Sequence, residues 1–168
     1  MKRIVLTGVG GQSVRVISHI LATALKELEY HVALLYDYDS SIRNQRITAY
    51  LTYDKHPIEN PMIDEADILI RLHAKGDQLI AQKTICDTGL CADEEVPFGM
   101  MGIERFGKPI FGNMIALGRL FRLIGLELVP GEIGANLLAA RERDDHVVAH
   151  VAVHGLALLS ELDGHAGL

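Results

Sequence analysis

The chain has 168 residues, of which 49% are apolar and 23% are charged, and its formal net charge at pH 7 is -6. This balance is typical of a folded globular domain and excludes a mainly disordered chain, which needs few apolar residues and a high net charge. The acidic balance argues against general nucleic-acid binding, which usually requires a basic face. The two cysteines are too few for a disulfide scaffold or for a self-contained iron–sulfur cluster with four cysteine ligands.

The same composition predicts a protein of the reducing cytoplasm, with no membrane partner. Met1 and the two basic residues after it could open a signal peptide, but the apolar residues that follow run directly into Gly8. A first β-strand is therefore the better interpretation. The most apolar segment, residues 109–126, is interrupted by Arg119 and Arg122, so no stretch is both long enough and uncharged enough to span a bilayer.

Strands and helices alternate in the first half of the chain. Apolar residues at helical spacing predict an amphipathic helix over 13–29, and a second, short helix is predicted over 73–82. Short runs of apolar and β-branched residues predict strands, and a polar stretch predicts a loop over 39–46. The predicted strands are residues 4–7, 31–36, 47–53, 66–72 and 83–87.

Helices dominate the second half. Residues 113–125 carry apolar side chains on nearly every side, so we expect this helix to be buried all round, with Asn113 as its cap and Gly125 at its end. Two further helices are predicted over about 130–141 and 146–162. This order predicts an α/β fold: an open, mostly parallel Rossmann-like sheet with helices on both faces and a helical C-terminal part, in one domain over 1–168.

The strongest local signal is the glycine loop, defined here as residues 8–13 between the first strand and the first helix. Its glycines allow a tight turn and a close backbone approach, and free N–H groups at the start of the helix favour an anion. Gly8 and Gly10 match the first two glycines of the dinucleotide fingerprint, whereas Ser13 stands where the third belongs. Asp37 closes the second strand, about where a ribose-binding acid would lie. A turn without a ligand, a phosphate or other anion site, and an NAD site all stay open.

Other candidate groups carry weaker signals. Histidines 146, 150 and 154 share one stripe of the predicted last helix, but no third ligand stands nearby in a telling pattern, so we expect a solvated or interface face and no metal. Cys86 and Cys91 are interpreted as buried, reduced thiols.

Charged residues frame two of the predicted loops. Arg43 and Arg46 flank the polar loop, where they are either solvated or bind an anionic ligand or a carboxylate of a partner subunit. The acidic run over residues 93–95 is expected to be only solvated.

Several segments, taken in order, resemble the gamma subunit of the 2-oxoacid:ferredoxin oxidoreductases. Residues 8–14 (GVGGQSV) resemble the family's G-x-G-G-Q-G-V, with Ser13 replacing the last glycine. Residues 38–45 (YDSSIRNQ) resemble its Tyr-Gly-Pro-Glu-x-Arg-Gly-Gly segment; Tyr38 and Arg43 match, while Asn44 and Gln45 replace both final glycines. The resemblance covers essentially the whole chain and extends to the third domain of the single-chain pyruvate enzymes. It also rests on residues 54–58, 66–70, 113–118 and 149–155.

The resemblance implies a part in the oxidative decarboxylation of a 2-oxoacid to an acyl-CoA, with coenzyme A as co-substrate and ferredoxin or a similar acceptor. Thiamine diphosphate and Mg are expected on alpha and beta subunits, and 4Fe–4S clusters on a ferredoxin-like (delta) subunit, in an anaerobic metabolism. This chain is expected to hold no catalytic residue, metal or cofactor of its own and to be inactive alone. Its expected contribution is a set of residues near the coenzyme or the nucleotide tail of coenzyme A: Gly8, Gly10, Gly11, Gln12, Ser13, Tyr38 and Arg43.

The residues themselves agree with a non-catalytic chain, because the sequence holds no nucleophile elbow and no H-E-x-x-H motif. Two alternatives from other classes are a stand-alone, nucleotide-binding Rossmann-like domain that regulates a partner, and a structural subunit whose glycine loop is empty.

Overall fold

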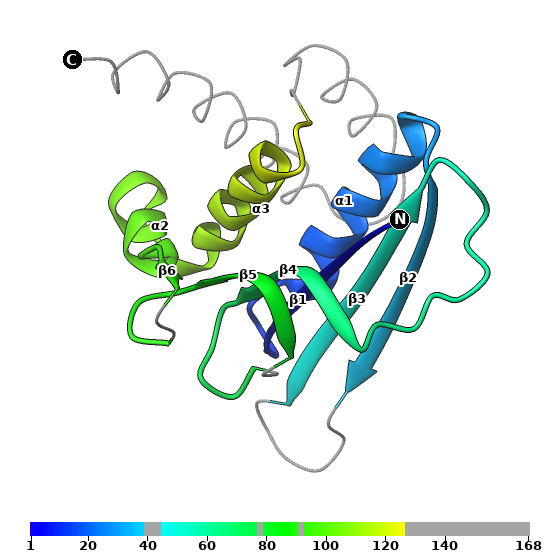
Figure 1. The fold of residues 1–168 in the computed structure, drawn as a ribbon. Coiled ribbons are helices and arrows are strands. Elements are labelled where there is room, and N and C mark those ends of the chain that lie inside the picture. The colour runs from blue at the N-terminus through cyan, green and yellow to red at the C-terminus, as the bar shows by residue number, and fades with distance from the viewer. Residues whose placement is uncertain (39–44, 77–78, 91–92, 127–168) are drawn as a thin grey trace.

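The computed structural model describes residues 1–38, 45–76, 79–90 and 93–126, which are organised around one mixed β-sheet (Figure 1). The strand order is β2-β3-β1-β4-β5-β6. β3 runs antiparallel to both of its neighbours, and the β1–β4, β4–β5 and β5–β6 pairs are parallel. The predicted open, mostly parallel α/β sheet is therefore confirmed. Its strands are β1 (Lys2–Val9), β2 (His31–Tyr38), β3 (Arg46–Asp54), β4 (Glu65–Arg71), β5 (Ile80–Cys86) and β6 (Glu94–Glu95).

The helices of the described chain lie on one side of this sheet (Figure 1). They are α1 (Val14–Glu27), α2 (Phe98–Phe106) and α3 (Gly112–Leu123), with a 3-10 turn η1 (Pro109–Phe111) before α3. The helices predicted over 13–29 and 113–125 correspond to α1 and α3, and α2 was not predicted. The helices predicted over 130–141 and 146–162, with their three histidines, lie outside the described residues.

The alternation of side chains along β1 explains which face the helices cover. Ile4 and Leu6 point to the helical side and are fully buried in the main core together with α1 and α3. Val5 points to the other side, where it joins a smaller cluster under the β3–β4 connection. Strands with apolar residues on both faces need cover on both, as is usual for parallel strands. The smaller cluster consists of Val5, Ile63, Ala66 and Leu69, with Tyr50, Leu79 and Ala81 packed against it.

The predicted helix over 73–82 is wrong, because β5 already begins at Ile80. β4 and β5 are parallel neighbours, so the chain must return along the length of β4 between residues 72 and 79. β4 has seven residues and spans roughly 20 Å, whereas eight helical residues would rise only about 12 Å. A helix is too short for this connection, and Gly76 instead closes a turn onto the carbonyl of His73 (N–O distance 2.8 Å).

α3 confirms the expected burial on all sides over its first two turns. Residues 112–118 are all buried, because α3 packs against both α1 and α2 as well as the core. Its end also follows the prediction. Gly125 has a positive φ of 72°, and the N–H groups of Gly125 and Leu126 bond to the carbonyls of Arg122 and Phe121, which is a Schellman cap.

The acidic run over 93–95 is more than a solvated surface. The carboxylate of Glu94 accepts hydrogen bonds from Arg119 Nε and Nη2 (3.0 and 2.8 Å) and pairs with Lys83 Nζ (2.8 Å). The hydrogen bond from Lys83, with help from Arg119, holds the pKa of Glu94 below its usual range. These contacts join β5, β6 and α3.

The expectation of two reduced thiols is wrong for Cys86, which is fully buried and disulfide-bonded. Cys91, the other cysteine of the chain, lies outside the described residues.

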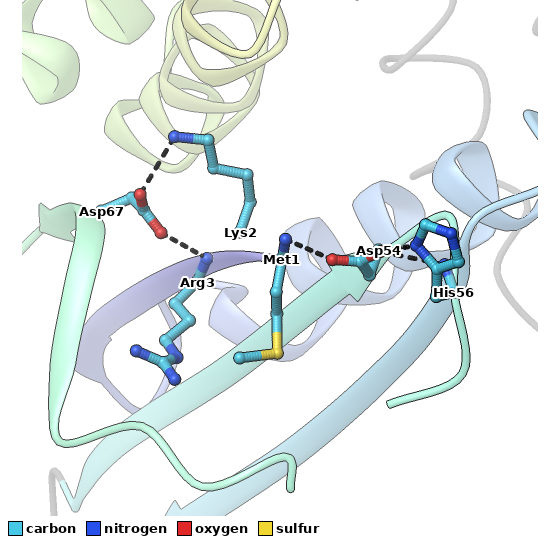
Figure 2. Close-up of polar contacts among 6 residues, drawn as sticks. All are labelled: Met1, Lys2, Arg3, Asp54, His56 and Asp67. Atoms are coloured by element: carbon cyan, nitrogen blue, oxygen red, sulfur yellow. Dashed lines mark hydrogen bonds and ion pairs between the residues drawn. The ribbon is translucent and has the colours of Figure 1, made fainter. Parts of the chain in front are cut away.

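Charged groups join the N-terminal end of β1 to both neighbouring strands (Figure 2). Asp67 on β4 accepts hydrogen bonds from Lys2 Nζ (3.0 Å) and the Arg3 N–H (2.8 Å). Asp54 at the end of β3 pairs with the Met1 ammonium group. Partial burial acts to raise the pKa of Asp67, but the bonds from Arg3 and Lys2 outweigh it, so this pKa lies below its usual range.

The burial of α3 generates a stability prediction. Leu120 is fully buried in the main core, so Leu120→Ala should lower the free energy of unfolding by roughly 2–5 kcal/mol. Leu28→Ala, at a leucine that is 41% exposed, is the matched control and should cost far less. Urea denaturation of the full chain measures both, and a loss below about 1 kcal/mol for Leu120→Ala would contradict the packing described here.

The lowered pKa of Asp67 predicts how stability depends on pH. Because its folded-state pKa lies below the unfolded one, Asp67 stabilises the fold above the ordinary aspartate pKa of about 4, and this contribution disappears as the pH falls through the folded-state value. Asp67→Asn should therefore destabilise the chain at neutral pH, and the difference from wild type should shrink in acid. Denaturation curves at several pH values measure this difference.

Asp64→Asn, at an exposed aspartate, is the control. If Asp67→Asn lowers the free energy of unfolding equally at every pH, the assignment is wrong.

Candidate functional site

The glycine loop lies at the C-terminal ends of β1 and β4, where the chain leaves neighbouring strands in opposite directions. After β1 it crosses by α1 to β2 at one edge, and after β4 it goes to β5 on the other side. Such a switch point is where open α/β sheets bind ligands. The predicted site residues of the glycine loop therefore stand at the edge where this fold usually binds.

The side chain of Gln12 joins the two strands at this point. Its Oε1 accepts a hydrogen bond from the Val9 N–H, and its Nε2 donates to the carbonyl of Leu72, directly after β4 (both 2.9 Å). Its backbone N–H bonds to the Val9 carbonyl (3.1 Å), and its backbone carbonyl accepts a bond from the Asn113 side chain. Gln12 is thus held at four atoms and fixes the loop to β1, β4 and α3.

The sequence prediction for Asn113 changes as a result, and the structure adds a role for Gln12. Asn113 does not cap α3: it lies inside the helix, is 6% exposed, and uses its amide to hold the glycine loop. Gln12 was predicted as a ligand-binding residue, but both ends of its side-chain amide are used within the chain. We therefore assign Gln12 as a residue that positions the loop.

Backbone geometry explains the glycines. A Cβ at Gly8 would lie 2.6 Å from Gln12 Oε1 and 3.1 Å from Val14 Cγ2, so a side chain there would displace the Gln12 amide. Gly11 has a φ of 90°, which favours glycine. Ser13 also has a positive φ of 55°, so the serine keeps a left-handed conformation that glycine adopts more easily.

The exposed surface of the loop presents hydrogen-bond donors. Gly10 and Gly11 are exposed, and the N–H groups of Gly11, Ser13 and residues 14–16 at the start of α1 have no acceptor within the described part of the chain. That first turn carries no acidic side chain, and the exposed Arg15 adds a positive charge. Free N–H groups at a helix start favour an anion, so the loop has the chemistry to accept a phosphate.

The β2–β3 hairpin lies beside this loop. The Gly10 N–H bonds to the carbonyl of Gln45 (2.9 Å), and Val9 pairs with Arg46 in the sheet. Tyr38, the last residue of β2, is 43% exposed. Gln45, at one end of segment 38–45, thus contacts the loop, while Tyr38 lies one strand further out on β2 and Arg43 lies outside the described residues.

The position of Asp37 argues against a dinucleotide site. In the dinucleotide fold the acid follows the strand next to the glycine loop, but here β3 lies between β1 and β2. Asp37 is therefore two strand spacings, about 10 Å, from β1. Its Oδ2 also pairs with Arg46 Nη2 (2.7 Å).

The described residues contain neither a metal-ligand cluster nor a membrane-spanning helix. No group of three or more histidine, cysteine, aspartate or glutamate side chains gathers there in a way that could hold a metal ion. No helix among those residues is long and apolar enough to cross a membrane.

Comparison with known proteins supplies the family. Residues 3–90 match the model of the pyruvate ferredoxin/flavodoxin oxidoreductase family, which is more than half of the chain. The chain belongs to this family. The match includes the glycine loop, α1 and the strands β1 to β5. The resemblance found in the sequence is therefore confirmed.

One relative and two solved structures give further likenesses. The chain is 27% identical over 131 residues to the KorC subunit of 2-oxoglutarate synthase from Archaeoglobus fulgidus, covering 73% of this chain and 70% of that one. Its fold resembles the pyruvate oxidoreductase subunit PORC of Thermotoga maritima (TM-score 0.66, 15% identity, 95% of each chain). It also resembles the gamma subunit of a keto/oxoacid ferredoxin oxidoreductase from Geobacter sulfurreducens (TM-score 0.63, 14% identity, 96% of this chain and 97% of that one).

A third structure shows the same fold inside a longer polypeptide. It is a 2-oxoglutarate:ferredoxin oxidoreductase from Magnetococcus marinus with 2-oxoglutarate, coenzyme A and succinyl-CoA bound (TM-score 0.67, 12% identity). The match covers 97% of this chain but 31% of that one. The fold of this family member therefore occurs both as a separate subunit and as part of a larger chain.

The loop geometry predicts that Gly8 and Gly10 differ in their tolerance of a side chain. Gly8→Ala should lower the free energy of unfolding by about 1–3 kcal/mol, because its Cβ must displace an amide that makes two hydrogen bonds. Gly10→Ala is the matched control, since a Cβ there meets no atom within 4 Å. Chemical denaturation measures both variants.

A third variant identifies the cause. In a Gln12→Ala background the added cost of Gly8→Ala should shrink, because the clashing amide is gone. If Gly8→Ala lowers the free energy of unfolding equally with and without the Gln12 side chain, the Gln12 amide is not the reason for a glycine at position 8.

Proposed function

We propose that this chain is the gamma subunit of a multisubunit 2-oxoacid oxidoreductase. The complex would decarboxylate a 2-oxoacid oxidatively to an acyl-CoA and pass the electrons to ferredoxin or a similar acceptor. The observation that carries the proposal is the family match over residues 3–90, which contains the whole glycine loop. The full-length likeness to two separate subunits of such enzymes supports the gamma position.

In this proposal the chain does not perform the chemistry alone. Thiamine diphosphate, Mg and 4Fe–4S clusters would be held by alpha, beta and ferredoxin-like (delta) partners. The carbanion chemistry at the oxo carbon would be supplied by the thiamine coenzyme. The described residues of this chain offer no metal-ligand cluster. We also propose that the complex is cytoplasmic and serves an anaerobic metabolism.

The chain's own contribution would be an anion contact near the nucleotide tail of coenzyme A or near the coenzyme. Gly8, Gly10 and Gln12 would set the shape of the loop, since the Gly10 N–H is used by the Gln45 carbonyl, and Gly11 and Ser13 would offer backbone N–H groups to a phosphate. Tyr38 and Arg43 would close the site from the hairpin. The residues fit such a group because the exposed donors face no acidic side chain on the first turn of α1.

Purification from the native source tests the proposal. We expect this chain to co-purify with thiamine- and cluster-bearing chains, and the complex to reduce ferredoxin only with both a 2-oxoacid and coenzyme A present. A chain that purifies alone and binds a nucleotide would instead support the regulatory-domain alternative. A stable complex whose activity is unaffected by every loop variant would support the purely structural alternative.

Arg43 provides a sharper prediction within that complex. A guanidinium can bind a phosphate or a carboxylate with two parallel hydrogen bonds, and lysine cannot reproduce this geometry. We expect Arg43→Lys to weaken assembly or turnover, and Arg43→Ala to weaken it more, while the fold of the lone chain survives both changes. Steady-state rates and subunit co-elution measure the effect. If both variants match wild type in rate and in complex size, Arg43 has no part in the site.

A further inference from the structure

The two edges of the sheet are protected very differently. β6 has only two residues, both glutamates, and a short charged edge offers little to a neighbouring chain. β2, at the other edge, has eight residues, and its centre Val32–Tyr36 contains no charge, glycine or proline. No strand of the described chain pairs with the outer side of β2. A long uncharged edge of this kind is a template for a further strand.

The side chains of β2 match an interface better than a solvated edge. Leu35 is 40% exposed and Tyr38 43%, although both are large and apolar. The basic and the acidic residue of the strand, His31 and Asp37, stand near its two ends and are both exposed. This places one basic and one acidic group symmetrically about an apolar centre.

We propose that the outer edge of β2 pairs antiparallel with β2 of a second copy of this chain. In an antiparallel pair, two residues that lie opposite each other either both direct their N–H and C=O groups toward the other strand or both direct them away. Successive residues of one strand alternate between these two directions, so two opposite residues of β2 must both have odd numbers or both have even numbers. In a twofold-symmetric pair the residue numbers of every opposite pair add up to the same value, and this value must therefore be even. The axis must then pass through a residue, and axes through Leu34 or Leu35 each align seven residues of β2.

Charge selects between these two registers. With the axis through Leu34, His31 of each copy lies opposite Asp37 of the other, and Val32 lies opposite Tyr36. An imidazole can donate a hydrogen bond to a carboxylate opposite it, and pairs of β-branched with aromatic residues are favourable across strands. With the axis through Leu35, Asp37 would face Ala33 and His31 would have no counterpart. The pairing is therefore centred on Leu34.

The groups required for this pairing are available. Asp37 uses Oδ2 for Arg46, and Oδ1 has no partner in the part of the chain that the structure describes. Among the described helices, α1 also leaves room. α1 contacts β1, β2 and β3 and so lies about one strand in from the edge. The two β3 strands of the joined sheet would be three spacings apart, roughly 14 Å, which exceeds the 8–10 Å of packed helices.

Engineered disulfides test the register. In the full chain, the double variant His31→Cys/Asp37→Cys should form a covalent dimer of twice 18.4 kDa under mild oxidation, because residues 31 and 37 face each other. Each single variant is a matched control. Its two new thiols would be six positions apart, about 20 Å, which is beyond the reach of a disulfide. All three variants keep the natural cysteines, so wild type gives the background. A double variant that links no more than the single variants overturns the proposal.

Charge reversal tests the same interface without a covalent bond. Sedimentation over a concentration series should show wild type in a monomer–dimer equilibrium. His31→Glu places a carboxylate opposite Asp37 twice in each dimer and should raise the dissociation constant by about 2- to 30-fold. His19→Glu makes the same change at an exposed histidine of α1 and should leave it unaltered.

Two further results would overturn the proposal. One is a wild-type chain that stays monomeric throughout the concentration series. In that case, slowed amide exchange along β2 after addition of another subunit would assign the edge to that subunit. The other is a dimer with equal dissociation constants for His31→Glu and His19→Glu, which would place the interface elsewhere. All of these measurements use the chain without its partners, so they succeed or fail independently of the proposed enzymatic role.

Discussion

The arrangement of the candidate site depends on one side chain, the amide of Gln12, which occupies the gap between the ends of β1 and β4. Both strands end there and their chains diverge, which leaves backbone groups that need partners. Gln12 provides an acceptor for Val9 and a donor for Leu72 at the same time. Gly8 must lack a side chain because the amide lies where its Cβ would be. Asn113 then fixes the backbone of the same residue to α3. The side of the glycine loop that faces the protein is thus fixed by hydrogen bonds, and only the N–H groups on its outer side are left for a ligand.

Because of the antiparallel strand β3, the groups beside the glycine loop differ from those of a dinucleotide fold. Insertion of β3 between β1 and β2 brings the β2–β3 hairpin to the glycine loop, through the bond between Gly10 and Gln45. It also moves Asp37 one strand further from the loop, where its Oδ2 pairs with Arg46. The acid that would hold a ribose is therefore displaced, whereas the donors that suit a phosphate stay in place. The same insertion leaves β2 as the edge strand of the sheet.

The sequence was sufficient for elements whose signal is local. Strands β1 to β4 follow short apolar runs, and α1 and the end of α3 follow helical spacing and Gly125. It was insufficient where the outcome depends on partners far along the chain. The failed helix over 73–82 was decided by the distance the chain must cover between parallel strands. The direction of β3 leaves no trace in its composition, because strands of either direction can be β-branched and buried. Asn113 looked like a cap because its true partner, Gln12, is 101 residues away.

Ser13 shows what a loop held in this way tolerates. The resembled motif has glycine at this position, and a left-handed conformation costs a non-glycine residue about 1–2 kcal/mol. Ser13 nevertheless adopts it, with φ 55° and ψ 26°, and no side-chain cap bond offsets the cost. The backbone on either side is fixed, by Gln12 before it and by the bond from Ile17 N–H to the Ser13 carbonyl after it. The left-handed turn at Ser13 therefore forms at an energetic cost that a glycine at the same position would not carry.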